Sequence, residues 1–79
     1  MKATVLVRPK AGILDPQGRA VESSLRQLGF SVGEARVGRV IDLEVNAASV
    51  DEARGEIERM CERLLANPLI ESYEIEVEA

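Results

Sequence analysis

The sequence contains no histidine, no tryptophan and a single cysteine, Cys61. Without histidine, the chain cannot build a Ser/His or Cys/His nucleophilic centre, and the usual zinc ligand sets are missing as well. We therefore expect no catalytic residues, no metal site and no bound cofactor in this chain. Cys61 lies on the apolar stripe of a predicted helix, and we interpret it as a buried small side chain. Because a lone cysteine cannot close an internal disulfide, a cytoplasmic location is the default expectation.

Aromatic residues are almost absent, since Phe30 and Tyr73 are the only two. The RNA-binding variant of a small α+β domain stacks bases on aromatic side chains of its central strands, and those are not available here. A formal net charge of −4 also argues against nonspecific nucleic-acid binding, which needs a basic surface. No apolar run approaches the roughly 18 residues of a membrane span, and the N-terminus has no signal-peptide core. These absences predict that the protein binds neither nucleic acid nor membrane.

Hydrophobic residues make up 46% of the chain, and in several segments they alternate with polar residues, as in β-strands. A chain of 79 residues is expected to be a single domain spanning residues 1–79. Alternation predicts a strand over residues 2–10 and another over residues 69–78. Between them, a clear strand around residues 41–45 is preceded by a weaker candidate over residues 32–37, which Gly33 interrupts. A hairpin at Gly38-Arg39 is the expected connection of these two.

Two helices are predicted from their start and stop signals. Asp15 before Pro16 is typical of an N-cap followed by proline at the first helical position, and Gly29 is a natural terminator, so the first helix covers residues 16–28. Ser49 and Glu52 have capping-box spacing, and the apolar stripe that follows reaches Leu65. The order is therefore βαββαβ, which predicts an α+β, ferredoxin-like fold: an antiparallel four-stranded sheet with two helices on one face.

The other face of this sheet is expected to be partly open, with Leu6 and Val40 on it. An uncovered sheet face on so small a domain favours self-association, as a homodimer or a dimer of dimers (homotetramer).

Most charges fit solvated helix and strand faces, but a few polar residues gather around two predicted loops. Gly18 is a poor helix former inside a first turn, which is explained if another segment or chain approaches it closely. The candidate partner-binding residues are Lys10, Asp15, Gln17, Gly18, Arg19, Arg36 and Arg39. The competing interpretation is that they are ordinary solvated charges.

Several short motifs in this order resemble one family. They are Gly12-Ile13-Leu14-Asp15-Pro16-Gln17-Gly18, Leu28-Gly29-Phe30, Arg36-Val37-Gly38-Arg39, Met60 to Pro68 (Met-Cys-Glu-Arg-Leu-Leu-Ala-Asn-Pro) and Ile70-Glu71-Ser72-Tyr73. Each is weak alone, but the ordered set is similar to the PurS family, the small subunit of phosphoribosylformylglycinamidine synthase, over nearly the whole chain. Arg39 departs from the family pattern, which usually has lysine there.

The resemblance implies a noncatalytic subunit of an ATP- and glutamine-dependent ligase complex in de novo purine biosynthesis. A PurQ-type glutaminase subunit would release ammonia, and a PurL-type synthetase subunit would convert formylglycinamide ribonucleotide to formylglycinamidine ribonucleotide with ATP and magnesium. This chain would bridge the two partners and support ammonia transfer. The alternative is a stand-alone regulatory module of ferredoxin-like topology that senses a small molecule.

Overall fold

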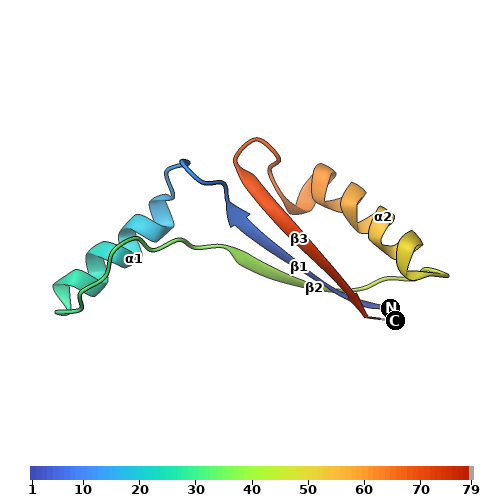
Figure 1. The fold of residues 1–79 in the computed structure, drawn as a ribbon, viewed down its shortest axis with the longest axis horizontal. Helices are drawn as coiled ribbons and strands as arrows, with labels where there is room; N and C mark the ends of the chain where they lie inside the picture. The colour runs from blue at the N-terminus through green and yellow to red at the C-terminus, as the bar shows by residue number, and fades with distance from the viewer. Residues whose placement is uncertain (79) are drawn as a thin grey trace.

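The computed structural model describes residues 1–78. Its elements follow in the order β1 (Lys2–Pro9), α1 (Pro16–Gln27), β2 (Arg39–Glu44), α2 (Val50–Met60), a π-helical turn η1 (Cys61–Leu65) and β3 (Glu71–Glu78). Figure 1 shows the sheet in the middle, α2 alongside it, and α1 projecting from the end that lies away from the two termini. Each element lies in a segment that the sequence predicts to be a helix or a strand.

The sheet has three strands in the order β2-β1-β3, and both pairings are antiparallel. Val5 stands between Ile41 and Ile75, and Ala3 stands between Leu43 and Val77, so one face is apolar on all strands. On the opposite face Leu6 is paired with Val40, which confirms the prediction that both lie on the open side. Alternation along each strand thus determines which side chains enter the core.

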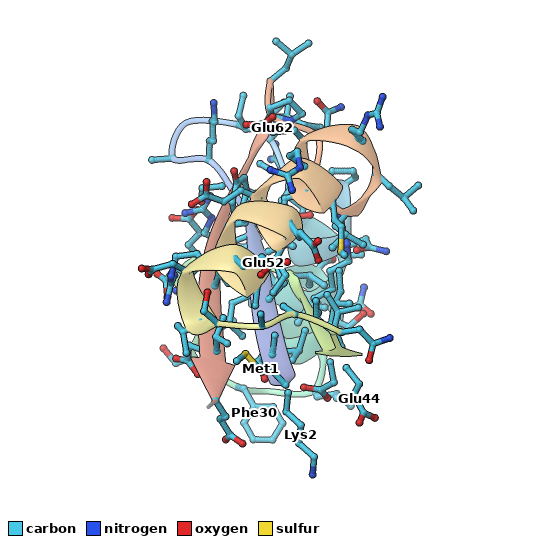
Figure 2. The ribbon with its side chains drawn as sticks, turned by 90° about the vertical axis from the view of Figure 1, so that its right-hand side faces the viewer. Met1, Lys2, Phe30, Glu44, Glu52 and Glu62 are labelled. Carbon is cyan, nitrogen blue, oxygen red and sulfur yellow. The ribbon has the colours of Figure 1, made fainter. Side chains whose placement is uncertain are left out.

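The core lies between this apolar face and α2. Its largest fully buried side chains are Val5 and Val7 from β1 together with Ile57 and Cys61 from the helical segment. The predicted cap is present, because the Glu52 N–H donates to Ser49 Oγ over 3.1 Å. Figure 2 shows this helix in front of the strands, with Glu52 on the helix and Glu62 on the η1 turn that follows it. Cys61 is buried as predicted, and burial raises the pKa of its thiol, so it remains protonated.

The four-stranded sheet predicted from the sequence is wrong. Residues 31–37 do not belong to a strand, and the chain passes through Gly38 into β2 without the predicted hairpin. Gly38 lies so close to the Val7 carbonyl that a Cβ there would collide with it. The glycine therefore allows the chain to cross the end of β1 at this point. The segment before it, residues 31–37, runs away from the sheet and does not lie back along β2.

The prediction that both helices cover one face is also wrong, because only α2 packs on the sheet. Helix α1 and the returning segment together form an arm, defined here as residues 16–37, that extends beyond the sheet (Figure 1). The radius of gyration is 15.8 Å, whereas a compact chain of this length has about 12 Å. Leu28 follows Val21 and Leu25 at helical spacing, which predicts that it is buried, but it is 73% exposed at the far end of the arm.

Candidate functional site

Three segments that are distant in the sequence meet where the arm joins the sheet. The Lys10 N–H donates to the Ile70 carbonyl over 2.9 Å, and Lys10 Nζ donates to the Pro68 carbonyl over 2.7 Å. The loop after β1 is thereby tied to the turn before β3, and β2 begins beside them. Together they surround a hollow of about 440 Å³, lined by Pro9 and by residues 13–17, 37–39 and 70–71. This hollow is the candidate functional site.

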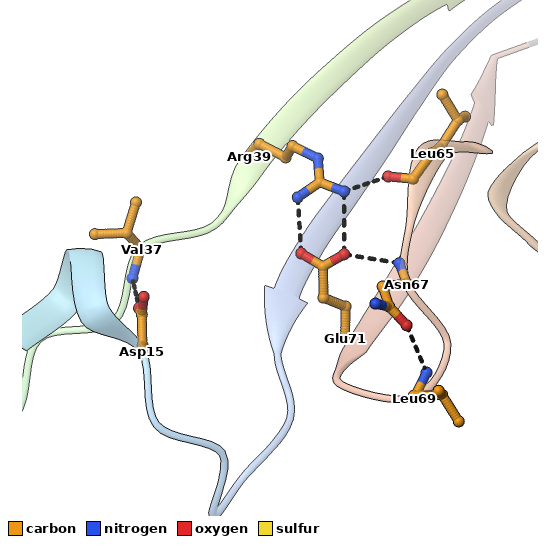
Figure 3. A network of polar contacts seen from close by, with 7 residues as sticks. All are labelled: Asp15, Val37, Arg39, Leu65, Asn67, Leu69 and Glu71. Atoms are coloured by element: carbon orange, nitrogen blue, oxygen red, sulfur yellow. Dashed lines mark hydrogen bonds and ion pairs between the residues drawn. The ribbon is translucent and has the colours of Figure 1, made fainter.

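One wall of the hollow is the junction between α1 and the returning segment. The Val37 N–H donates to Asp15 Oδ2 over 2.7 Å (Figure 3), and this hydrogen bond holds the pKa of Asp15 below its ordinary value of 3.8. Gly18 lies against the Ala35 carbonyl, so closely that a Cβ would collide with it. The glycine that is unfavourable for a helix is thus explained by a close approach within the same chain.

The opposite wall is an ion pair between Arg39 and Glu71. Arg39 Nη1 donates to Glu71 Oε2 over 2.7 Å, and Nη2 donates to Glu71 Oε1 over 3.1 Å, which is a bidentate arrangement (Figure 3). Arg39 also donates to the Leu65 carbonyl, and Glu71 accepts from the Asn67 N–H over 2.7 Å. The hydrogen bond from Arg39 lowers the pKa of Glu71 below its usual 4.5 and raises that of Arg39. This network fixes the end of η1 to the start of β2.

Around the hollow, apolar side chains lie at the surface. Leu14 is 73% exposed, Leu69 is 82% exposed and Ile70 is 44% exposed. The first belongs to the loop after β1 and the other two to the turn before β3. An exposed apolar group of this kind, next to hydrogen-bonding side chains, is typical of a protein-binding surface.

The structure brings the seven predicted site residues to one region but gives them different tasks. Lys10, Asp15 and Arg39 are engaged in the internal hydrogen bonds described above. Gly18 provides space for a carbonyl, and Arg36 donates to the Pro9 carbonyl. Within residues 1–78, only the exposed side chains of Gln17 and Arg19 have no hydrogen-bond or ion-pair partner among these seven.

Sequence reasoning missed the structural role of Glu71 and the apolar surface group. A signal for Glu71 exists in the sequence, since it is the single charged residue in an otherwise apolar alternating series from Leu69 to Val77. No comparable signal marks Leu14 or Leu69, because isolated leucines in loops are common. Their importance follows only from the contact between the two loops.

Among residues 1–78 no group of three or more histidine, cysteine, aspartate or glutamate side chains could hold a metal ion. Cys61 lies in the core away from this surface. Neither helix of the described chain is long and apolar enough to cross a membrane.

Comparison with known proteins gives matches over nearly the full length. A family model described as PurS, phosphoribosylformylglycinamidine (FGAM) synthase, matches residues 2–79. The phosphoribosylformylglycinamidine synthase subunit PurS of Methanocaldococcus jannaschii is 42% identical over 78 residues, which cover 98% of this chain and 94% of that protein.

Solved structures give the same result. Bacillus subtilis PurS is 37% identical, covers 99% of this chain and 98% of its own, and has a TM-score of 0.88. A chain in the structure of PurLQS from Thermotoga maritima is 36% identical, with 95% and 93% coverage and a TM-score of 0.84. The aligned part of this chain must include the arm, because the fraction of the chain left unaligned is far smaller than the fraction that residues 16–37 represent.

Proposed function

This chain belongs to the PurS family of phosphoribosylformylglycinamidine (FGAM) synthase subunits, and we propose that it holds the two larger subunits of that enzyme together for ammonia transfer. It is the small subunit of FGAM synthase in purine biosynthesis. The synthetase (PurL-type) and glutaminase (PurQ-type) subunits are its partners, in line with the match to the PurLQS structure.

In this proposal the chemistry takes place on the larger subunits. The glutaminase releases ammonia, and the synthetase uses ATP and magnesium to convert formylglycinamide ribonucleotide to formylglycinamidine ribonucleotide. Ammonia that escapes into water becomes ammonium, which is no longer nucleophilic, so the two sites must be kept in register. The contribution of this chain is to supply binding surfaces at a fixed geometry.

One of these surfaces is the hollow with its apolar surroundings. The observation that carries this assignment is that two loops separated by more than 50 residues meet there and leave Leu14, Leu69 and Ile70 exposed together. Gln17 and Arg19, at the start of α1, add hydrogen-bond donors that other groups of the described chain do not use. The internally bonded residues Asp15, Gly18 and Arg39 hold the hollow in shape and contact a partner less directly.

We also propose that the chain is a single domain, that it forms a homodimer or a dimer of dimers, and that it is located in the cytoplasm. Self-association is supported by the exposed apolar side chains of the arm and of the outer sheet face, such as Leu28 and Val40. The cytoplasmic location is supported by membership in a biosynthetic enzyme complex. The alternative of a small-molecule-sensing module is not favoured, since the full-length match to the PurLQS structure supports the subunit role.

Co-purification tests the docking surface. Tagged synthetase and glutaminase are mixed with the wild-type chain, with the double variant Leu14→Ser/Gln17→Ala, and with the control Leu64→Ser, which replaces an 83% exposed leucine that does not line the hollow. We expect the double variant to be lost from the complex while the control is retained. If the double variant co-elutes as the wild type does, the larger subunits bind another surface.

A further inference from the structure

A second depression lies on the outer face of the sheet, the face opposite α2, at the end where the arm joins. Its volume is about 310 Å³, and we call it the outer depression. Leu6 and Val40, paired across β1 and β2, form its apolar floor, and Val40 is 62% exposed. Its charged residues are Arg8, Arg36 and Arg39, and none of the described residues that line it is acidic. Arginine beside an exposed apolar floor is typical of a protein-binding surface.

A basic lining is a local exception in an acidic chain. Residues 8–39 contain six lysines and arginines and three acidic residues, whereas residues 40–78 contain three and eleven. The far end of the same sheet face is lined by carboxylates, from Asp42 and Glu44 of β2 and Glu76 and Glu78 of β3. A partner that carries carboxylates is therefore attracted to the outer depression and repelled by the rest of this face.

Two of the three arginines have only weak ion pairs within the chain. Arg8 Nη1 lies 3.8 Å from Glu74 Oε1, and the two side chains are 64% and 66% exposed. Arg36 Nε also lies 3.8 Å from its carboxylate, Glu34 Oε1, and the Glu34 side chain is 77% exposed. Exposed pairs of this kind contribute little to stability. Carboxylates of a partner can therefore replace Glu74 and Glu34 at small cost.

The outer depression and the hollow lie back to back. Alternation places Leu6 and Val40 on the outer face, whereas the Arg39 side chain bonds to η1 on the opposite face. The two depressions share Pro9 and Gly38 as well as Arg39, so they adjoin at the end of the sheet. Two partners seated in them are therefore neighbours.

We propose that one larger subunit docks in the outer depression while the other occupies the hollow. Its docking surface places an apolar side chain on Leu6 and Val40 and carboxylates on Arg8 and Arg36. This inference rests on the bridging role proposed above, which requires two surfaces, and it supplies the one that the hollow leaves open. Because the two depressions adjoin, both subunits are held side by side, which keeps the path of ammonia between them short.

A second copy of this chain is the competing occupant, since the two ends of the outer face have opposite charge. A face of three strands is small, however. With strands about 4.8 Å apart and a rise of roughly 3.3 Å per residue, about six residues per strand present about 300 Å². A stable interface buries about 800 Å² on each partner. A second copy stacked here brings the same small face, whereas a larger subunit can extend its contact onto the arm.

Photo-crosslinking in the assembled complex tests the occupant directly. A photo-reactive amino acid replaces Val40, Leu14 or Leu64 in turn, and the crosslinked products are identified by mass. We expect the probe at position 40 to label one larger subunit, the probe at position 14 to label the other, and the probe at position 64 to label neither. The inference is overturned if position 40 labels nothing, labels a second copy of this chain, or labels the same subunit as position 14.

Charge reversal tests the chemistry of the partner. Arg8→Glu and the control Arg63→Glu lower the net charge equally, and Arg63 is exposed on η1 away from both depressions. Arg8→Glu should raise the dissociation constant of the subunit labelled from position 40 at least about tenfold in low salt. The difference should shrink above roughly 0.15 M salt, and Arg8→Lys should bind as the wild type does. Equal weakening by both reversals, or none by Arg8→Glu, contradicts an acidic partner at this depression.

The two docking surfaces can fail separately. If Leu14→Ser/Gln17→Ala loses a subunit and Arg8→Glu retains both, the hollow is a docking site and the outer depression is not. If Arg8→Glu loses a subunit and the hollow variant retains both, the outer depression is supported and the assignment of the hollow is wrong.

Discussion

Asp15 and Val37 lie 22 positions apart in the chain and are joined by a hydrogen bond of 2.7 Å from the Val37 N–H to the Asp15 carboxylate. This bond closes the arm at its root. Asp15 therefore has two roles. It precedes Pro16 at the start of α1, and its carboxylate holds residues 31–37 against the helix. The position of the arm therefore depends on a residue that the sequence alone places in a partner-binding loop.

The first prediction concerns the pH dependence of this bond. The pKa of Asp15 is lowered in the folded chain, so the bond stabilises the fold fully above the unfolded value of 3.8 and is lost as the pH falls through the lower folded value. Asp15→Asn should therefore be less stable than the wild type near neutral pH, and the difference should shrink on acidification below about pH 4. Urea unfolding of both chains across this range is the measurement; a constant difference would show that the charge of Asp15 is unimportant.

A second prediction uses two glycines of the arm. Gly18→Ala places a Cβ against the Ala35 carbonyl, while Gly33→Ala meets no atom within 4 Å. We expect the first change to lower the free energy of unfolding by about 1–3 kcal/mol, since the collision outweighs the gain in helix propensity. The second change should be neutral or slightly stabilising. Thermal melts of the two variants decide, and equal melting temperatures would contradict the close approach.

The third prediction tests the core under α2. Ile57 is fully buried against the sheet, so Ile57→Ala should destabilise by about 2–5 kcal/mol. Leu64→Ala, on the exposed side of the helical segment that follows, should change stability by less than about 0.5 kcal/mol. If the Ile57 variant melts within a degree of the wild type, α2 does not cover the apolar face as described.

The fourth prediction concerns the Arg39 to Glu71 pair. Both side chains are partly exposed, so solvent limits the coupling between them to about 1 kcal/mol in a double-mutant cycle with Arg39→Ala and Glu71→Ala. Because the pKa of Glu71 is lowered in the folded chain, the coupling is present above the ordinary value of 4.5 and fades as the pH falls below it. Additive effects of the two substitutions at neutral pH would mean that the pair does not fix η1 to β2.

Local patterns in the sequence predict the elements well. Pro16 and Gly29 bracket the first helix, Ser49 caps the second, and alternation identifies all three strands of the sheet. Each of these signals depends on neighbours within one or two turns, so the full fold is not needed to interpret them.

The arrangement of the arm could not be predicted in the same way. The pattern around Gly38 is equally compatible with a hairpin and with a straight passage, and the difference is decided by a contact with Val7, more than 30 positions away. The same holds for the hollow, which requires Lys10 to meet Pro68 and Ile70. Residues 32–37 have strand character, but alternation in the sequence does not reveal that they pair with no strand of the described chain.

We propose that this chain serves the FGAM synthase complex by binding its larger subunits at the hollow. The most direct measurement is FGAM formation by the reconstituted complex, at limiting concentration of this subunit, with glutamine or with free ammonia as the nitrogen source. For Leu14→Ser/Gln17→Ala we predict a loss of about tenfold or more with glutamine, equivalent to ~1.4 kcal/mol of binding energy, and less than about twofold with ammonia. Leu64→Ser, at an exposed position that does not line the hollow, should match the wild type with both. Equal loss with both nitrogen sources, or no loss with either, would contradict the account.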